Sequence, residues 1–159
     1  MNQSSPLANA PRVAIVASSW HADIVNNGTQ AIKAELARRG VPADQVTQFR
    51  VPGAFEIPLH AQRLARSGRF DAIIACGLIT NGGIYRHEFV TSAVIDGLMR
   101  VQLDTGVPVL SAVLTPHHFH EHAEHRRIFG EHFVVKGTEA AQAALKTVAL
   151  HRQLTALTR

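Results

Sequence analysis

The chain has 159 residues, 46% of them apolar, which suits one folded domain with a sizeable core and excludes a disordered chain. Lysines and arginines outnumber aspartates and glutamates by 16 to 12, a formal charge of +4. No run of five or six like charges occurs, so the composition argues against a nucleic-acid-binding protein and leaves small anions as candidate ligands.

The only cysteine, Cys76, lies inside an apolar run. We expect it to be a small buried hydrophobe rather than a reactive thiol, and a lone cysteine without an internal disulfide fits a reducing cytoplasm. The first residues lack the pattern of a signal peptide, and no apolar run approaches the ~20 residues that span a bilayer. These features predict a soluble cytoplasmic protein.

Residues 1–11 are polar and contain proline, so we expect a flexible arm ahead of a single domain at residues 12–159. The apolar run Val13–Ala17 predicts a buried strand. A helix follows, for which Asp23 is a candidate cap. Its apolar residues keep helical spacing at Val25, Ile32 and Leu36. Gly28 weakens this helix by about 1 kcal/mol relative to alanine, which predicts close packing there.

The strand and helix pattern then repeats. Val46–Val51 predicts a second strand, less apolar than the first and therefore a candidate edge strand. Helical spacing resumes after the Pro52-Gly53 break, with apolar residues at Ile57, Ala61, Leu64 and Ala65. Pro58 is compatible with this helix only in its first turn.

The third predicted strand, Asp71–Leu78, is almost wholly apolar, as expected where helices cover both faces of a parallel sheet. The next helix carries Val90, Val94, Leu98 and Val101 on one face. A fourth strand at Val107–Leu114 and a helix from Thr138 to about Leu157 complete the chain. This α/β alternation predicts a four-stranded parallel sheet in a three-layer αβα sandwich, with ligands at the carboxyl ends of the strands.

Unusual residues gather in the loops that follow the strands. Trp20, the only tryptophan, is either a hydrophobic plug or a platform for a flat heteroaromatic ring. Glu56 either caps a helix or, with the amides of Gly53–Phe55, binds a polar ring edge or a polyol. The Asn81–Ile84 turn is either an ordinary tight turn or an anion site whose amides near Gly83 meet a phosphate.

Two further groups of polar residues stand out. Arg86, His87 and Glu88 stand in a row at a helix start, where ionisable groups can move protons. Six of the ten histidines lie between positions 117 and 132. His118, His122 and His125 have the spacing of a metal-binding helix face, but no cysteine is near, and we expect no native metal site. A solvated face, a subunit contact, or anion contacts by His125, Arg126 or Arg127 are the alternatives.

Four motifs, in order along residues 12–157, resemble the lumazine synthase family. They are the Trp20 loop, VPGAFEIP at 51–58, GLITNGGIYRHEFV at 77–90 and TGVPVLSAVLT at 105–115. The Trp20 loop, GGIYRHEFV and TPHHFHEH are similar to the type II branch of that family.

The resemblance implies a flavodoxin-like fold and a transferase of the penultimate step of riboflavin biosynthesis. Such an enzyme condenses 5-amino-6-(D-ribitylamino)uracil with 3,4-dihydroxy-2-butanone 4-phosphate, giving 6,7-dimethyl-8-ribityllumazine, phosphate and water, without a metal or organic cofactor. The implied partners are these two small substrates and further copies of the chain. The assembly would be built from pentamers, as a decamer with active sites between subunits, without nucleic acid or membrane.

The resemblance also implies roles for residues at matching positions. Binding of the pyrimidine and its ribityl chain would fall to Trp20, Ala54, Phe55, Glu56, Leu78, Ile79, Thr80 and Ser111. Binding of the phosphate would fall to Gly83, Ile84, His125 and Arg126. Catalytic proton handling would fall to Arg86 or His87.

Three positions depart from the family pattern. Arg86 holds the place of the catalytic histidine, with His87 one residue later, and arginine is a poor proton donor. Ser111 replaces an aromatic residue that is usually reached from a neighbouring subunit, and His125 replaces the phosphate arginine. The alternative function is therefore a flavin- or lumazine-binding protein with little or no turnover.

Overall fold

The computed structural model describes residues 7–119 and 122–159. The strands of this part are β1 (Val13–Ser18), β2 (Val46–Val51), β3 (Ala72–Leu78) and β4 (Val109–Leu114). They form one parallel sheet in the order β2-β1-β3-β4, which confirms the predicted sheet and the edge position of the second strand. The helices are α1 (Ala22–Arg38), α2 (Ile57–Arg66), α3 (His87–Thr105) and α4 (Ala123–Leu157).

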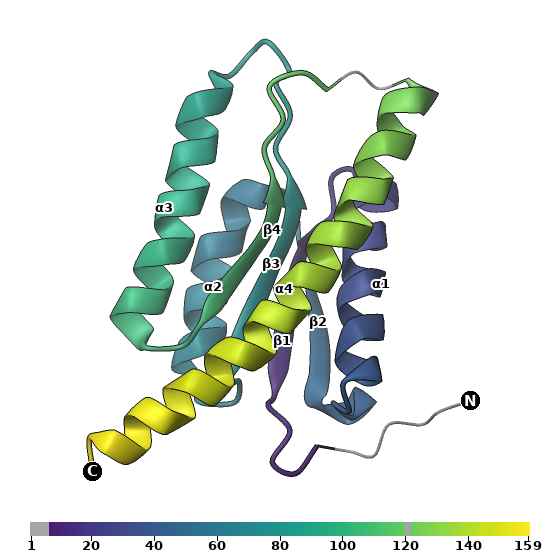
Figure 1. Cartoon of the computed structure of the whole chain (residues 1–159). Coiled ribbons are helices and arrows are strands. Elements are labelled where there is room, and N and C mark those ends of the chain that lie inside the picture. The colour runs from purple at the N-terminus through teal and green to yellow at the C-terminus, as the bar shows by residue number, and fades with distance from the viewer. Residues whose placement is uncertain (1–6, 120–121) are drawn as a thin grey trace.

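The helices cover both faces of the sheet, α1 and α4 on one and α2 and α3 on the other (Figure 1). Every residue of β1 and β3 is therefore buried, which explains their unbroken apolar runs. Two short 3-10 helices, η1 (Ala43–Gln45) and η2 (Ala54–Glu56), precede β2 and α2. Pro58 lies in the first turn of α2, as predicted. No helix within 7–119 or 122–159 is long and apolar enough to cross a membrane.

Two helix starts differ from the predictions. The residue before α1 is His21, whose backbone is left-handed (φ 56°), so the predicted Asp23 cap is wrong. Asp23 lies in the first turn, and its carboxylate pairs with Arg126 of α4. Helix α4 begins at Ala123 rather than Thr138, because its histidine-rich first half packs Phe133 onto the core.

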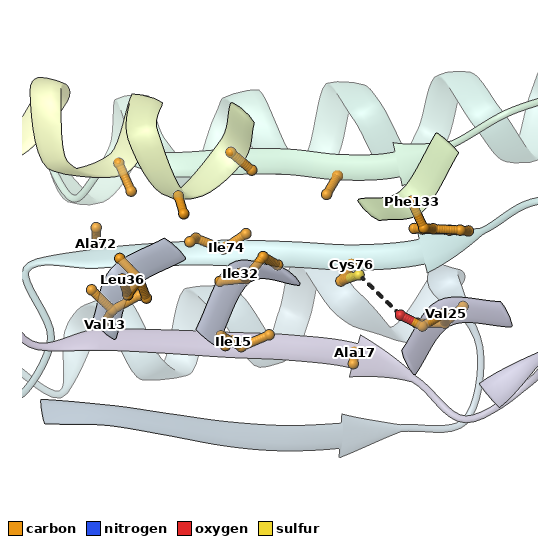
Figure 2. Packing of buried hydrophobic residues seen from close by; sticks show 14 of the residues in the cluster. Val13, Ile15, Ala17, Val25, Ile32, Leu36, Ala72, Ile74, Cys76 and Phe133 are labelled. Atoms are coloured by element: carbon orange, nitrogen blue, oxygen red, sulfur yellow. Dashed lines mark hydrogen bonds between the residues drawn. The ribbon is translucent and has the colours of Figure 1, made fainter. Parts of the chain in front are cut away.

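Helices α1 and α4 approach closely over the sheet, and we call their contact the α1–α4 seam. A Cβ at Gly137 would stand 2.6 Å from the carbonyl oxygen of Gly28, and one at Gly28 would stand 2.8 Å from both Cys76 Sγ and the Phe133 ring. The buried Cys76 thiol donates to the carbonyl oxygen of Val25 at 3.7 Å, and burial raises its pKa to about 12 (Figure 2). The predicted close packing at Gly28 and burial of Cys76 are confirmed.

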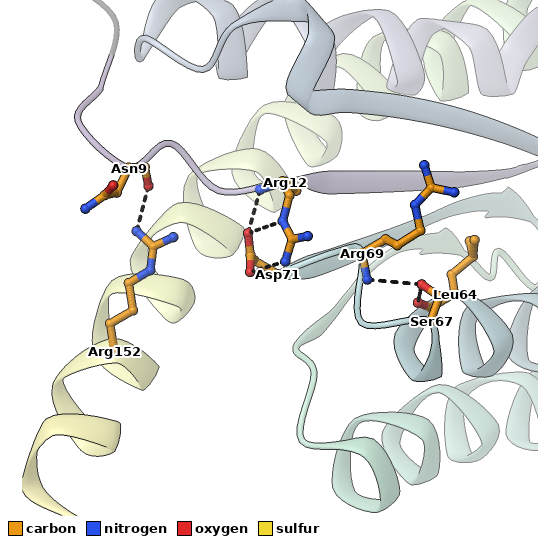
Figure 3. Close-up of polar contacts among 7 residues, drawn as sticks. All are labelled: Asn9, Arg12, Leu64, Ser67, Arg69, Asp71 and Arg152. Atoms are coloured by element: carbon orange, nitrogen blue, oxygen red, sulfur yellow. Dashed lines mark hydrogen bonds and ion pairs between the residues drawn. The ribbon is translucent and has the colours of Figure 1, made fainter. Parts of the chain in front are cut away.

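At the amino end of the sheet, Asp71 accepts hydrogen bonds from the Arg12 amide at 2.8 Å and from its guanidinium at 3.2 and 3.3 Å (Figure 3). Burial alone would raise the pKa of Asp71, but the Arg12 contacts outweigh it and lower that pKa. Arg152 of α4 donates to the carbonyl oxygen of Asn9 at 2.7 Å, which ties this part of the expected arm to the domain. Residues 1–6 of that arm lie outside the described residues.

Candidate active site

A cavity of about 290 Å³ lies at the carboxyl edge of the sheet, between the loops after β1, β2 and β3 and the start of α3. This is the edge at which parallel α/β sheets bind ligands. Eight predicted site residues line it: Trp20, Ala54, Phe55, Leu78, Ile79, Thr80, Ile84 and His87. The structure therefore brings together residues from three separate motifs of the chain.

Trp20 stands at the mouth of the cavity with 64% of its surface exposed, which argues against a buried plug. Its amide donates to the carbonyl oxygen of Pro52 at 3.0 Å, and this bond holds the loop after β1 beside the end of β2. A Cβ at Gly53 would stand 2.5 Å from the indole, so the ring packs directly on that glycine. An indole ring that packs on the backbone at Gly53 and is otherwise open to solvent is suited to stacking on a flat ligand.

The loop after β2 provides a second aromatic wall. Phe55 lines the cavity and is 63% exposed. Glu56, which does not line the cavity, accepts a hydrogen bond from the Gly53 amide at 2.8 Å. The capping role of Glu56 considered from the sequence is therefore present, and it fixes the loop that carries Phe55 and supports Trp20.

The loop after β3 also lines the cavity. The Ile79 amide donates to the carbonyl oxygen of Leu114 at 2.9 Å, which continues the β3–β4 pairing up to the cavity. Beyond it the chain turns at Gly83 (φ 79°), whose amide donates to Asn81 Oδ1 at 3.3 Å. This is the tight turn considered from the sequence, and Gly83 itself does not line the cavity. Ile84, 88% exposed, is part of the lining.

Arg86 and His87 point to different surroundings. His87, the first residue of α3, lines the cavity and is only 5% exposed. The exposed Arg86 side chain donates to Glu88 Oε1 at 2.9 Å and lies 4.6 Å over the Phe89 ring, outside the lining. A backbone hydrogen bond and, to a smaller extent, the contact with Arg86 lower the pKa of Glu88 against the opposing effect of burial. Of the two proposed catalytic side chains, only the imidazole is part of the cavity wall.

Three other predicted site residues lie apart from this cavity. Ser111 is exposed on the edge strand β4, where its hydroxyl accepts from the Val113 amide at 3.3 Å. His125 and Arg126 lie in the first turn of α4, where His125 packs 4.4 Å from the His122 ring, centroid to centroid.

The histidines do not form the metal-binding face considered from the sequence. His118 precedes α4 and His122 stands just before its first residue, so His118, His122 and His125 do not share the helix face that was considered as an alternative. Within 7–119 and 122–159, no group of three His, Cys, Asp or Glu side chains is placed to hold a metal ion.

Four lining residues were not predicted: His21, Gly82, Tyr85 and Val90. All four lie in or beside loops that the sequence had marked. Tyr85, the only tyrosine, is 79% exposed, and a lone aromatic residue after a glycine pair is a signal that could have identified it. His21 packs edge-on against Phe119, 5.7 Å between centroids, which links the cavity to the connection after β4.

A parallel αβα sandwich with an open cavity at its carboxyl edge, lined by exposed aromatic rings and a buried histidine, is typical of enzymes that act on small polar substrates. The family model described as 6,7-dimethyl-8-ribityllumazine synthase matches residues 10–152. The chain therefore belongs to the 6,7-dimethyl-8-ribityllumazine synthase family.

Individual relatives agree with this family. The chain is similar to the 6,7-dimethyl-8-ribityllumazine synthase of Rhodococcus erythropolis, with 60% identity over 137 residues that cover 86% of this chain and 88% of the relative. It is also similar to 6,7-dimethyl-8-ribityllumazine synthase 2 of Pseudomonas syringae pv. tomato, at 49% identity over 90% of this chain and 84% of the relative. The protein of that name from Bradyrhizobium diazoefficiens is 51% identical over 89% of this chain and 84% of its own length.

Proposed function

We propose that the chain condenses 5-amino-6-(D-ribitylamino)uracil with 3,4-dihydroxy-2-butanone 4-phosphate to 6,7-dimethyl-8-ribityllumazine, phosphate and water. This is the penultimate step of riboflavin biosynthesis. The observation that carries the proposal is the cavity that the exposed rings of Trp20 and Phe55 line together with Gly82 and Ile84 of the turn after β3. Such a lining suits a flat pyrimidine at the rings and a phosphate at the turn.

The pyrimidine would stack on Trp20, with Ala54 and Phe55 beside its ribityl chain. Backbone groups of Leu78–Thr80, at the end of β3, would bind the polar edge of the ring. Leu78, the last residue of β3, pairs with Leu114 of β4, and the Ile79 amide donates to the Leu114 carbonyl oxygen, so this backbone is held in place before any ligand binds. The carboxylate of Glu56 would contact the ribityl chain in addition to accepting the hydrogen bond from the Gly53 amide.

The phosphate would bind at the Gly83–Ile84 turn. The Gly83 amide would exchange its 3.3 Å contact with Asn81 for a phosphate oxygen, which as an anion is the stronger acceptor. His125 and Arg126 remain candidates for a second phosphate contact. For Arg126 this requires release of its ion pair with Asp23.

Proton transfer falls to His87 in this proposal, and Arg86 supplies positive charge at the rim. The reaction itself depends mainly on holding two substrates face to face, which can lower a barrier by several kcal/mol. An imine forms between the uracil amino group and the ketone, phosphate leaves, and the ribitylamino nitrogen closes the ring.

We infer a cytoplasmic homo-oligomer built from pentamers, a decamer in the type II branch. The position of Ser111 on an exposed edge strand supports a site completed by a neighbouring copy. Exposed apolar side chains on α3, among them Met99 and Leu103, provide surface for such an assembly.

The test is to incubate purified protein with both substrates and follow lumazine fluorescence. We expect a rate well above the uncatalysed reaction and proportional to enzyme concentration. A protein that binds lumazine or flavin but gives only the uncatalysed rate would instead be the binding protein considered from the sequence. Sedimentation under the same conditions would report a species heavier than one chain if the site is shared.

A further inference from the structure

Tyr85 is an exposed aromatic residue in the wall of the cavity. It is the only tyrosine of the chain, and it lines the cavity together with Trp20 and Phe55. It belongs to the loop between β3 and α3, two residues before α3 begins, and 79% of its surface is exposed. None of the substrate contacts proposed for the neighbouring residues involves its side chain.

Tyr85 and Trp20 differ in how their rings are held. The indole of Trp20 packs on the backbone at Gly53. The Tyr85 side chain, in contrast, makes no hydrogen bond, ring contact or ion pair with any residue of 7–119 or 122–159. A large ring that stays in water forgoes the stabilisation that burial provides, and a ligand that covers the ring would supply it.

The backbone around Tyr85 is held firmly at its two ends and loosely between them. The β3–β4 pairing fixes one end, and the first turn of α3 fixes the other. Among residues 80–85, all of which the structure describes, the one hydrogen bond joins the Gly83 amide to Asn81 Oδ1. Nothing lies within 4 Å of a Cβ built at Gly82 or Gly83. The loop can therefore bring the Tyr85 ring against a ligand without breaking core contacts.

We propose that Tyr85 is a substrate-binding residue whose ring covers a pyrimidine that is stacked on Trp20. This inference rests on the proposed function and adds to it a residue that determines specificity for a flat ring. Three exposed aromatic side chains around one cavity favour such a ligand, because both offset-stacked and edge-to-face contacts stabilise pairs of flat rings. The aromatic ring of Tyr85, not its hydroxyl, makes the contact.

The ring and the hydroxyl are separated by a matched pair of variants. Calorimetric titration with 5-amino-6-(D-ribitylamino)uracil alone measures binding without turnover. Tyr85→Ala removes the ring, and we expect Kd to rise about three- to tenfold, the range of one aromatic contact. Tyr85→Phe removes only the hydroxyl, and its Kd should stay within about twofold of wild type. An unchanged Kd in Tyr85→Ala, or equal losses in both variants, would overturn the role of the ring.

Phe89 provides a control for the loss of any exposed ring near this loop. It lies in the first turn of α3, is 62% exposed and does not line the cavity. Phe89→Ala should leave the Kd for the same pyrimidine within about twofold of wild type, since no aromatic contact with the ligand is lost. A loss as large as that of Tyr85→Ala would contradict a specific contact by Tyr85.

The single tyrosine also allows its ring to be observed directly in the full-length protein. Protein labelled with 3-fluorotyrosine should give one ¹⁹F signal, and we expect this signal to shift when the pyrimidine is added. Nitration of the unlabelled ring by tetranitromethane should become slower in the presence of the pyrimidine. A ring that neither shifts nor gains protection, including one that a neighbouring copy of the chain already covers, would overturn the inference.

The proposed function and this inference can fail separately. Failure of the wild-type protein to form lumazine from both substrates would reject the proposed function. Pyrimidine binding that depends on the Tyr85 ring would still appear in the titration and in the ¹⁹F spectrum, because neither measurement requires turnover.

Discussion

Glycine has opposite roles in two regions of the molecule, the α1–α4 seam and the loop of residues 79–86, which we call the cavity loop. In the seam, Gly28 and Gly137 are buried, and a Cβ on either would overlap neighbouring atoms. In the cavity loop, nothing lies within 4 Å of a Cβ built at Gly82 or Gly83. The seam has no room for a larger side chain at either glycine, whereas the cavity loop leaves space that a ligand can fill.

The largest effect expected from this comparison is on stability. Gly137→Ala would press a methyl group against the Gly28 carbonyl, and we expect the free energy of unfolding to fall by about 2 kcal/mol, a typical cost of overpacking. Gly82→Ala is the matched control in the loop, and its unfolding free energy should stay within about 0.5 kcal/mol of wild type. Urea unfolding of both variants measures the difference. Equal losses of unfolding free energy in the two variants would show that the seam and the cavity loop do not differ in packing.

The next largest effect is on binding at the cavity. Trp20→Ala removes the exposed indole, and we expect affinity for the pyrimidine substrate to fall about tenfold, from the loss of stacking and burial. Stability should change little because the ring is not part of the core. Isothermal titration with the pyrimidine substrate checks this, and an unchanged Kd would remove Trp20 from the stacking role.

A smaller effect should follow from Gly53→Ala. The added methyl group would displace the indole that packs on Gly53, and we expect about three- to fivefold weaker pyrimidine binding, part of the stacking contribution. The double variant with Trp20→Ala is the control. If Gly53 acts only through the ring, the second substitution adds no further loss once Trp20 is absent.

The smallest effect concerns acid stability of the seam. Hydrogen bonds from Arg38 and Arg39 lower the pKa of Glu35 to about 2, against the opposing effect of burial, and Gln142 of α4 donates to the same carboxylate at 3.2 Å. Since the ordinary pKa is 4.5, this carboxylate stabilises the fold above that pH and loses its contribution as pH falls toward 2.

Glu35→Gln should therefore flatten the decline of stability between pH 4.5 and about 2. Urea midpoints of wild type and variant, measured at neutral pH and at two values inside this window, provide the check. Parallel pH profiles of the two proteins would show that Glu35 does not contribute to acid sensitivity.

Most of the fold could be predicted from the sequence because its apolar periods match its elements. The unbroken apolar runs at β1 and β3 indicated central strands, and both are buried throughout. The first half of α4 could not be predicted in this way. Histidines and glycines interrupt its apolar pattern, and it is helical because Phe133 and Gly137 dock on the core, which is a tertiary effect.

The location of the cavity could also be predicted, since parallel sheets bind ligands at their carboxyl edge. The sequence could not show whether Arg86 or His87 lies in the cavity wall. Successive residues at a helix start differ in direction by about 100°, so a one-residue change in where α3 begins exchanges their surroundings. The contact of His87 Nε2 with the carbonyl oxygen of Ile79, eight residues earlier, is equally invisible in a linear pattern.

Helix α4 carries the chain from the cavity end of the molecule to the opposite end, where its C-terminus lies (Figure 1). Its 35 residues correspond to a rod of about 52 Å at the usual rise of an α-helix. A fluorescent protein, an affinity tag or a solid support joined after Arg159 would therefore be attached at the end of the subunit remote from the cavity mouth. This polarity makes the C-terminus the natural point for immobilising or displaying the enzyme with its active site accessible.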